Sequence, residues 1–177
     1  MNRQATLTPD AIQSKKNTVS AEEWQLRVDL AAAYRLIALD AQSGRPVPEF
    51  GVDGMVDLQR DNDQQFDLTT GEVGLHATPI VAGDVIIVGA AHRTGGNPRS
   101  RRNVKGYVRG YDARTGERLW IFHTIPRPGQ FGRDTWLSDS AVYTGNTGVW
   151  GQISVDLELG LAYLPVEAAT GDYFGAN

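Results

Sequence analysis

A turn motif that recurs along the chain constrains the fold more than any other feature. One copy reads RGYDARTGERLW, in which an aspartate and a Thr-Gly turn follow an apolar run. An earlier copy reads YRLIALDAQSGRPV, and its Asp40 and Gly44 precede the matching Asp112 and Gly116 by 72 residues. Aliphatic and aromatic runs favour strands, and glycine accepts the positive φ of a tight turn. Each copy therefore predicts a β-hairpin.

Two further stretches, TPIVAGDVIIVG and ISVDLELGLAYLPV, also read as strand, turn and strand. Together these signals define a unit of four strands, predicted at Thr78–Val81, Val85–Ala90, Gly106–Tyr111 and Leu119–Thr124. Four short antiparallel strands that recur at a fixed period are typical of a propeller blade. The period exceeds the roughly 40 to 50 residues of compact blades because a polar insertion, residues 92–105, separates the second and third strands. The sequence predicts an all-β chain.

The predicted blades do not close into a ring. A closed propeller needs at least about four blades, and at this period the chain holds about two. We therefore expect a partial β-propeller over residues 34–177, and a fragment of a larger protein.

Composition narrows the class of protein. The 20 glycines and eight prolines suit many short strands joined by turns. The formal net charge of −4 argues neither for nucleic acid nor for a membrane surface as a partner. The chain has no cysteine, which excludes disulfides, thiol nucleophiles and cysteine metal sites. It has no apolar run long enough to span a bilayer.

The insertion is rich in basic residues. A solvated loop explains such a cluster, and so does the rim of a site for an anionic ligand or substrate. Both interpretations stay open from the sequence. The basic residues are Arg93, Arg99, Arg101, Arg102 and Lys105.

Residues 1–33 form a separate lead-in, predicted to be partly helical or disordered. The first 19 residues are polar. They lack the basic start and the apolar segment that would predict a secretory signal. Ser20 and Glu23 form a capping box, and the alanines at 31–33 favour a helix. Residues 24–30, however, alternate as in a half-buried strand. Of the two, the helix is our prediction.

The stretches VRGYDARTGERLWIFHTIPRPGQFGRDTW and YTGNTGVWGQISVDLELGLAYLPVEAATGDYFG resemble the quinoprotein dehydrogenases that use pyrroloquinoline quinone (PQQ), in the branch of membrane-bound glucose dehydrogenase. The resemblance covers about residues 34–177 and implies part of an eight-bladed propeller. The Asp-x-x-Thr-Gly-x-x-x-Trp element that ends at Trp120 is similar to the family's tryptophan-docking repeat. The resemblance implies that Trp120 packs between blades, and the earlier copy has Pro48 at that position.

The same resemblance implies a set of cofactor-binding residues. Trp150, in NTGVWGQIS, corresponds to the tryptophan beneath the quinone plane, and an indole offers a flat face for stacking. His76 corresponds to a small hydroxyl residue that contacts the cofactor, although a histidine in a turn explains it equally well. Ala91 and His92 stand where relatives carry an acidic or amide side chain, which is a departure from the family pattern.

The family also pairs its quinone with calcium. Glu167, in LPVEAATGDY, corresponds approximately to a metal-ligand amide, and a carboxylate there suits a hard cation; an exposed turn glutamate is the competing interpretation. The family's catalytic aspartate, and the lysine and arginine near the quinone, belong to later blades. We therefore predict no catalytic residue in this chain.

The function that the resemblance implies is oxidation of an alcohol or aldose sugar. Electrons would pass to a respiratory acceptor, ubiquinone or cytochrome c, at the periplasmic face of the inner membrane. Two alternatives remain at this point. One is a non-catalytic β-propeller scaffold of the outer-membrane assembly type, and the other is a degenerate gene remnant.

Overall fold

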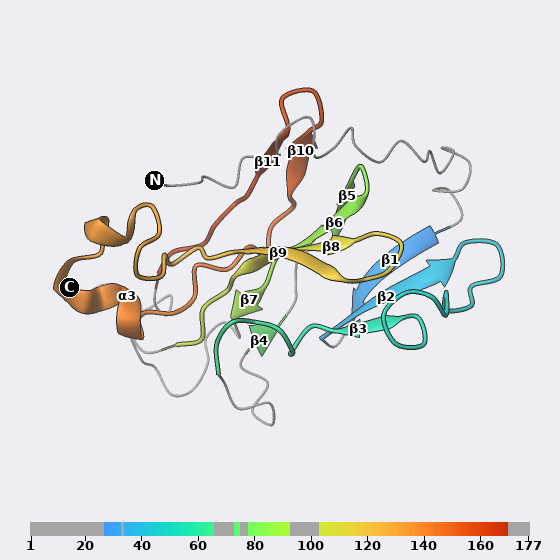
Figure 1. The fold of residues 1–177 in the computed structure, drawn as a ribbon, viewed down its shortest axis with the longest axis horizontal. Helices are drawn as coiled ribbons and strands as arrows, with labels where there is room; N and C mark the ends of the chain where they lie inside the picture. Colours follow the sequence, from blue (N-terminus) through green and yellow to red (C-terminus); the bar gives the residue numbers. More distant parts are fainter. Residues whose placement is uncertain (1–26, 33, 66–72, 75–77, 93–102, 170–177) are drawn as a thin grey trace.

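The computed structural model describes residues 27–32, 34–65, 73–74, 78–92 and 103–169. This part of the chain is mostly β, and its strands pair in antiparallel fashion (Figure 1). The strands are β1 (Arg27–Ala32), β2 (Arg35–Asp40), β3 (Met55–Asp57), β4 (Val73–Gly74), β5 (Ile80–Ala82), β6 (Val85–Val88), β7 (Ala91–His92), β8 (Val108–Asp112), β9 (Arg118–Phe122), β10 (Ser154–Asp156) and β11 (Leu161–Tyr163). The helical turns are η1 (Arg133–Thr135), η2 (Leu137–Asp139) and α3 (Ser140–Tyr143).

A central sheet holds four strands in the order β5-β6-β8-β9. Each neighbouring pair is antiparallel, so the four-stranded unit predicted from residues 78–124 is confirmed. β6 pairs directly with β8 along four residue pairs, from Val85 with Asp112 to Val88 with Arg109. The insertion therefore leaves this sheet without interrupting its ladder.

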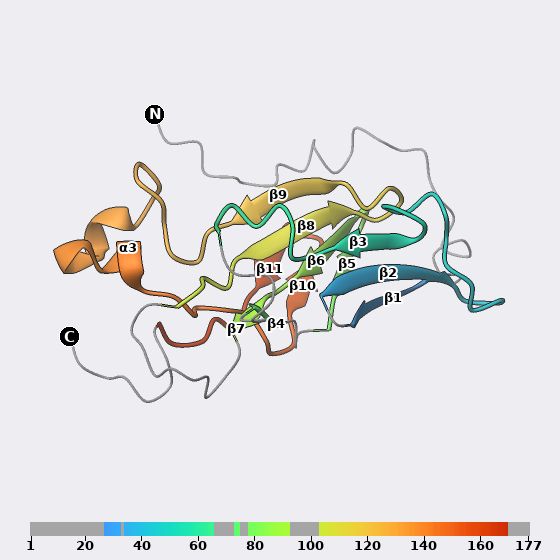
Figure 2. The ribbon, with the colours of Figure 1, turned by 90° about the horizontal axis from the view of Figure 1, so that it is seen from below.

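A second sheet, β1-β2-β3, precedes the central one (Figure 2). The helix predicted near the N-terminus is wrong for Arg27–Ala32, because these residues form β1 and pair with β2 from Arg27–Asp40 to Ala32–Arg35. The two-residue alternation was the better guide. Helix propensity is a weak preference, and a six-residue ladder overrides it. Residues 20–26 lie outside the described residues.

A third sheet, β10-β11, follows the central one as an antiparallel hairpin. The strand-turn-strand pattern of ISVDLELGLAYLPV is thereby confirmed. A four-stranded blade was expected after residue 140, but the described residues there form α3 and this two-stranded hairpin. In Figure 1 the hairpin projects at the top, whereas α3 lies at the left.

The same aspartate-to-glycine turn follows a strand in three of the four sheets of the described residues. Asp112 Oδ1 accepts from the backbone N–H of Thr115 at 2.9 Å, and Gly116 N donates to Asp112 O at 2.9 Å. Asp40 accepts from Ser43 in the same way, and Asp156 from Leu159. The glycines that follow, Gly44, Gly116 and Gly160, take φ values of 67°, 72° and 65°. A side chain at these φ values is strained, which explains the repeat seen in the sequence.

The central sheet is covered on both faces. On one face, Ile86, Val88 and Tyr111 pack against β2 and its neighbours in a cluster that we call the leading core. On the other, Ile87 and Val108 pack against the segment before β10 in what we call the trailing core. The leading core contains Leu36, Ala38, Phe50, Leu58, Ile86, Val88, Tyr111 and Ala113, and the trailing core is built on Ile87, Val108, Val149 and Ile153. Sheets stacked face to face in chain order are the packing of adjacent propeller blades.

Within the described residues, we find no helix with the length and apolar character needed to cross a bilayer.

Candidate functional site

Trp120 is partly buried at the edge of the trailing core, where two sheets meet. It pairs with Gly110 across the β8–β9 ladder and packs against the cluster that includes Val149 and Ile153. A Cβ added at Gly110 would lie 2.1 Å from Trp120 Cε2, so the indole covers the glycine at a distance that no side chain permits. These contacts support the docking role predicted for Trp120. Pro48, at the equivalent position of the earlier copy, is exposed.

Trp150 differs from Trp120 in its surroundings. It follows Val149, which bridges to Val166, and 53% of its surface is exposed. An exposed indole on a fixed backbone is an available stacking face, because a buried aromatic would already be covered by its neighbours. The position and exposure of Trp150 therefore suit a platform for a flat ligand.

The backbone before Trp150 is tightly packed and strained. Val149 N donates to Ala90 O at 2.9 Å, and a Cβ at Gly89 would lie 2.2 Å from Val149 O. Thr147 is buried and adopts a φ of 55°, which is unusual for a β-branched residue. Its hydroxyl lies 2.8 Å from that of Thr124. Strain of this kind persists where the surroundings determine the conformation, and here it fixes the direction in which the chain reaches Trp150.

Glu167 is on the segment that pairs with residues 146–149. Gly148 N donates to Glu167 Oε1 at 3.2 Å, and Glu167 N donates to Gly148 O at 2.9 Å. The carboxylate is therefore held at the backbone of Gly148, two residues before Trp150. Among the described residues, no group of three or more histidine, cysteine, aspartate or glutamate side chains gathers as a metal site. A metal-binding role for Glu167 stays a prediction.

The other predicted cofactor residues are less completely described. Ala91 and His92 form β7, which pairs with β4 through Gly74 and Val73. Ala90, just before them, is the residue that accepts the bond from Val149, so β7 begins next to the backbone that leads to Trp150. His76 lies outside the described residues.

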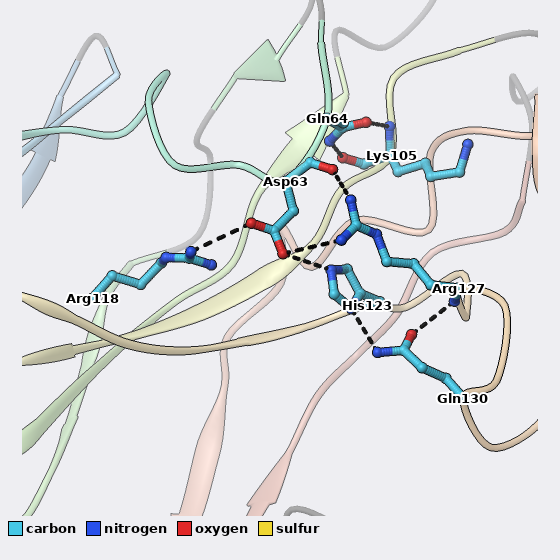
Figure 3. Close-up of polar contacts among 7 residues, drawn as sticks. All are labelled: Asp63, Gln64, Lys105, Arg118, His123, Arg127 and Gln130. Atoms are coloured by element: carbon cyan, nitrogen blue, oxygen red, sulfur yellow. Dashed lines mark hydrogen bonds and ion pairs between the residues drawn. The ribbon is translucent and has the colours of Figure 1, made fainter.

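A network of polar side chains around Asp63 was not predicted from the sequence (Figure 3). The Asp63 carboxylate lies 3.3 Å from a guanidinium nitrogen of Arg118, 3.2 Å from His123 Nε2 and 3.5 Å from a guanidinium nitrogen of Arg127. A guanidinium nitrogen of Arg127 also donates to the Asp63 carbonyl oxygen. These contacts join the loop after β3 to the end of β9 and the connection after it.

His123 is held in a single orientation. Gln130 Oε1 accepts from Arg127 N at 2.7 Å, which directs the Gln130 amide nitrogen toward His123 Nδ1 at 2.9 Å. The other ring nitrogen, Nε2, then carries the proton and donates to Asp63. Burial lowers the pKa of His123, and the nearby Arg127 charge lowers it further, against the opposing effect of Asp63. Because both nitrogens are engaged, His123 orders the connection and is not positioned as a catalytic base.

The Asp63 network could not be predicted from the sequence, because its residues are far apart along the chain. Asp63 and His123 are 60 residues apart, and the contact between them is made only when the β3 loop and the end of β9 meet. A run of acidic and amide residues, RDNDQQ, was the available signal. Such a run is equally typical of a solvated loop.

The antiparallel sheets, stacked in chain order on both faces of the central one, are the architecture of a partial β-propeller. Comparison with known protein families agrees, because residues 10–177 match the family described as "Glucose/ethanol/alcohol dehydrogenase, beta-propeller domain". The chain belongs to this PQQ β-propeller family.

The chain is distantly related in sequence to dehydrogenases that are much longer than itself. The chain is 32% identical over 146 residues to the quinoprotein glucose dehydrogenase of Escherichia coli, and the match covers 81% of this chain. It is 30% identical over 142 residues to the quinohemoprotein alcohol dehydrogenase ADH-IIG of Pseudomonas putida, covering 75% of this chain. Each match spans only 17% of the relative's length.

A solved structure confirms the fold. The quinohemoprotein alcohol dehydrogenase ADHIIG from Pseudomonas putida HK5 superposes with a TM-score of 0.60 over 83% of this chain, at 24% sequence identity. The superposed part is 20% of that enzyme. The partial propeller predicted from the repeat is therefore supported by the family match and by this superposition.

Proposed function

We propose that this chain supplies part of the cofactor pocket of a PQQ-dependent dehydrogenase that oxidises an alcohol or an aldose sugar. The observation that carries the proposal is Trp150, whose indole is exposed at the end of a rigid, strained segment. When bound, the quinone would accept the electrons of substrate oxidation, with a calcium ion beside it. The expected electron acceptor is ubiquinone or cytochrome c, in the periplasm.

Each residue of the pocket has a defined part in this proposal. Trp150 would stack on one face of the quinone and fix its plane. Glu167, whose Oε1 lies 3.2 Å from Gly148 N, would contribute a hard oxygen ligand to calcium. The β7 backbone at Ala91 and His92 would form the adjacent wall. The family resemblance adds His76 as a polar contact to a quinone carboxylate. The carboxylate base that takes the substrate's hydroxyl proton is expected in other blades, so turnover requires those blades as well.

Trp120 has a different part, because its contacts are with Gly110 and the trailing core. Loss of Trp120 should loosen the packing between sheets without removing a face of the cofactor pocket. The two tryptophans therefore make a matched pair in one experiment.

The proposal is tested by titrating the chain with PQQ and calcium while following tryptophan fluorescence. Quenching is expected in the wild type, since the quinone would lie against the Trp150 indole. Trp150→Ala should cost about 1–3 kcal/mol of binding, or roughly 5- to 150-fold in affinity, the scale of one stacked aromatic. Trp120→Ala should leave the affinity per folded molecule nearly unchanged.

The outcome that contradicts the proposal is equally clear. If the two variants lose affinity equally after correction for the folded fraction, or if Trp150→Ala loses none, the assignment of the tryptophans is wrong. In that case the non-catalytic scaffold becomes the better account of the chain.

A further inference from the structure

A cleft separate from the Trp150 segment lies beside the Asp63 network. Its volume is about 530 Å³, which is within the range of small-molecule sites. It is formed where four stretches distant in the sequence meet: residues 64–65, residues 103–107, the connection 125–133 and residues 141–143 of α3. Three basic side chains line it, Lys105, Arg127 and Arg133, and none of the described lining residues is acidic.

Within the described part of the chain, carboxylates balance only part of the positive charge of this cleft. Arg127 forms an ion pair with Asp63, but the same carboxylate also forms an ion pair with Arg118. Neither Lys105 nor Arg133 forms an ion pair with a carboxylate of the described residues. Burial lowers the pKa of Lys105, and the nearby charge of Arg133 lowers it further. An anion beside Lys105 would oppose both effects, because an opposite charge favours the charged ammonium.

The lysine is held in place by its own backbone. Gln64 Nε2 donates to Lys105 O at 2.6 Å, and Lys105 N donates to Gln64 Oε1 at 2.9 Å. Figure 3 shows the Lys105 side chain extending away from Asp63, so the ammonium group is not part of that network. Among the described residues, the ammonium donates one hydrogen bond, to Val142 O at 3.3 Å, which leaves two of its three donors for a ligand.

Neutral groups in the cleft add donors to the two cations. Tyr107 adds a hydroxyl that is hydrogen-bonded to Arg127, and burial raises the pKa of Tyr107 above its ordinary value of 10. The Tyr107 ring is fixed edge-on against His123, with ring centroids 4.5 Å apart. A site with two cations and a protonated hydroxyl suits oxygen acceptors that carry negative charge.

We propose that this cleft binds a small oxyanion, a carboxylate or a phosphate group, between Lys105 and Arg133. The site needs no quinone and stands apart from the function proposed above. It gives Lys105, one of the basic residues of the insertion, a ligand-binding role in place of a solvated one. Charge-assisted hydrogen bonds from an ammonium and a guanidinium are the contacts that would hold the anion.

The test is calorimetric titration of the intact chain at constant ionic strength with three probes: sodium phosphate, sodium gluconate and neutral glucose. Phosphate, gluconate or both should bind, and their relative affinities identify the preferred oxyanion. Lys105→Gln and Arg133→Gln should each weaken binding about fivefold, the scale of one partly exposed charge pair. Arg45→Gln is the matched control, because Arg45 is exposed in the turn after β2 and its substitution removes the same charge away from the cleft.

Three results would overturn the proposal: no binding of either anion, equal binding of glucose, or an equal loss in Arg45→Gln. A second measurement does not depend on the variants folding. The pKa of Lys105, followed by NMR of labelled lysine side chains, should rise when phosphate is added, because an anion favours the charged ammonium. An unchanged Lys105 pKa at high phosphate would contradict the site.

Discussion

The central sheet and the β10–β11 hairpin contain the same kind of turn, but neighbouring sheets bury the central sheet on both faces and the hairpin on one face only. β8 is buried on both faces, with Tyr111 in the leading core and Val108 in the trailing core. The hairpin contributes Val155 to the trailing core on one side, whereas its other apolar residues are exposed. The exposed ones are Leu157, Leu159, Leu161 and Tyr163. The local turn motif is therefore sufficient to form a hairpin, whereas burial of its apolar residues requires a neighbouring sheet.

The contrast also separates the two tryptophans for which we propose different roles. Trp120 belongs to the covered region and Trp150 is 53% exposed. Sequence composition alone does not distinguish these two indoles. Their neighbours in the stacked sheets do.

The largest effect is expected for Trp120→Ala. Removal of the indole leaves a cavity between two sheets, which should lower the free energy of unfolding by about 3 kcal/mol. Trp150→Ala is the matched control and should change it by less than about 0.5 kcal/mol, because the side chain is half exposed. Urea unfolding followed by circular dichroism measures both. Equal losses would remove the distinction between the covered and the open region.

A somewhat smaller effect is expected for Gly110→Ala. The new methyl group would meet the Trp120 ring and displace it, at a cost of about 2 kcal/mol. Gly83→Ala serves as a control for the loss of a glycine, since a Cβ there meets nothing within 4 Å, although its φ of 61° adds some strain. A Gly110→Ala variant as stable as the wild type would show that the indole does not lie on the glycine.

For the hairpin, the expected effect is on association. Exposed apolar residues on a strand favour pairing with other molecules, so we expect the chain to be oligomeric or poorly soluble. The double change Leu161→Ser and Tyr163→Ser should reduce this association while altering the free energy of unfolding by less than about 1 kcal/mol. Sedimentation velocity measures the first quantity. A monodisperse wild-type monomer would contradict the prediction.

The smallest effect concerns pH. The pKa of His123 is lower in the folded chain than its ordinary value of 6.5, so the unfolded chain binds the proton more readily. The stabilisation is complete above about pH 6.5 and is lost as the pH falls toward the folded pKa. The free energy of unfolding should therefore decrease between pH 7.5 and 5.5. His123→Gln should show a smaller decrease, and an identical decrease would assign the effect to other groups.

The sequence predicted the parts of the fold that local chemistry determines. The four strands within residues 78–124 and the hairpin after Ile153 were found because their alternation and turns are encoded within a few residues. β1 was mistaken for a helix because its partner, β2, supplies the ladder that decides its conformation. The docking role of Trp120 stays a prediction from the family resemblance, and its packing against the trailing core supports it.

The candidate sites were predictable to different degrees. Trp150 and Glu167 were identified by resemblance, and the structure adds the exposure of one and the backbone contact of the other. The Asp63 network and the pairing of Lys105 with Arg133 in one cleft were not predictable, because each depends on segments that meet only in the folded chain.

Amide hydrogen exchange tests the central claim, that neighbouring sheets stack on both faces of the central one. Amides of β6 and β8 should exchange most slowly, since they lie between the leading and trailing cores. Amides of β10 and β11 should exchange markedly faster, because the hairpin is covered on one side only. Equal protection in the two regions, or slower exchange in the hairpin, would contradict the stacked-blade account.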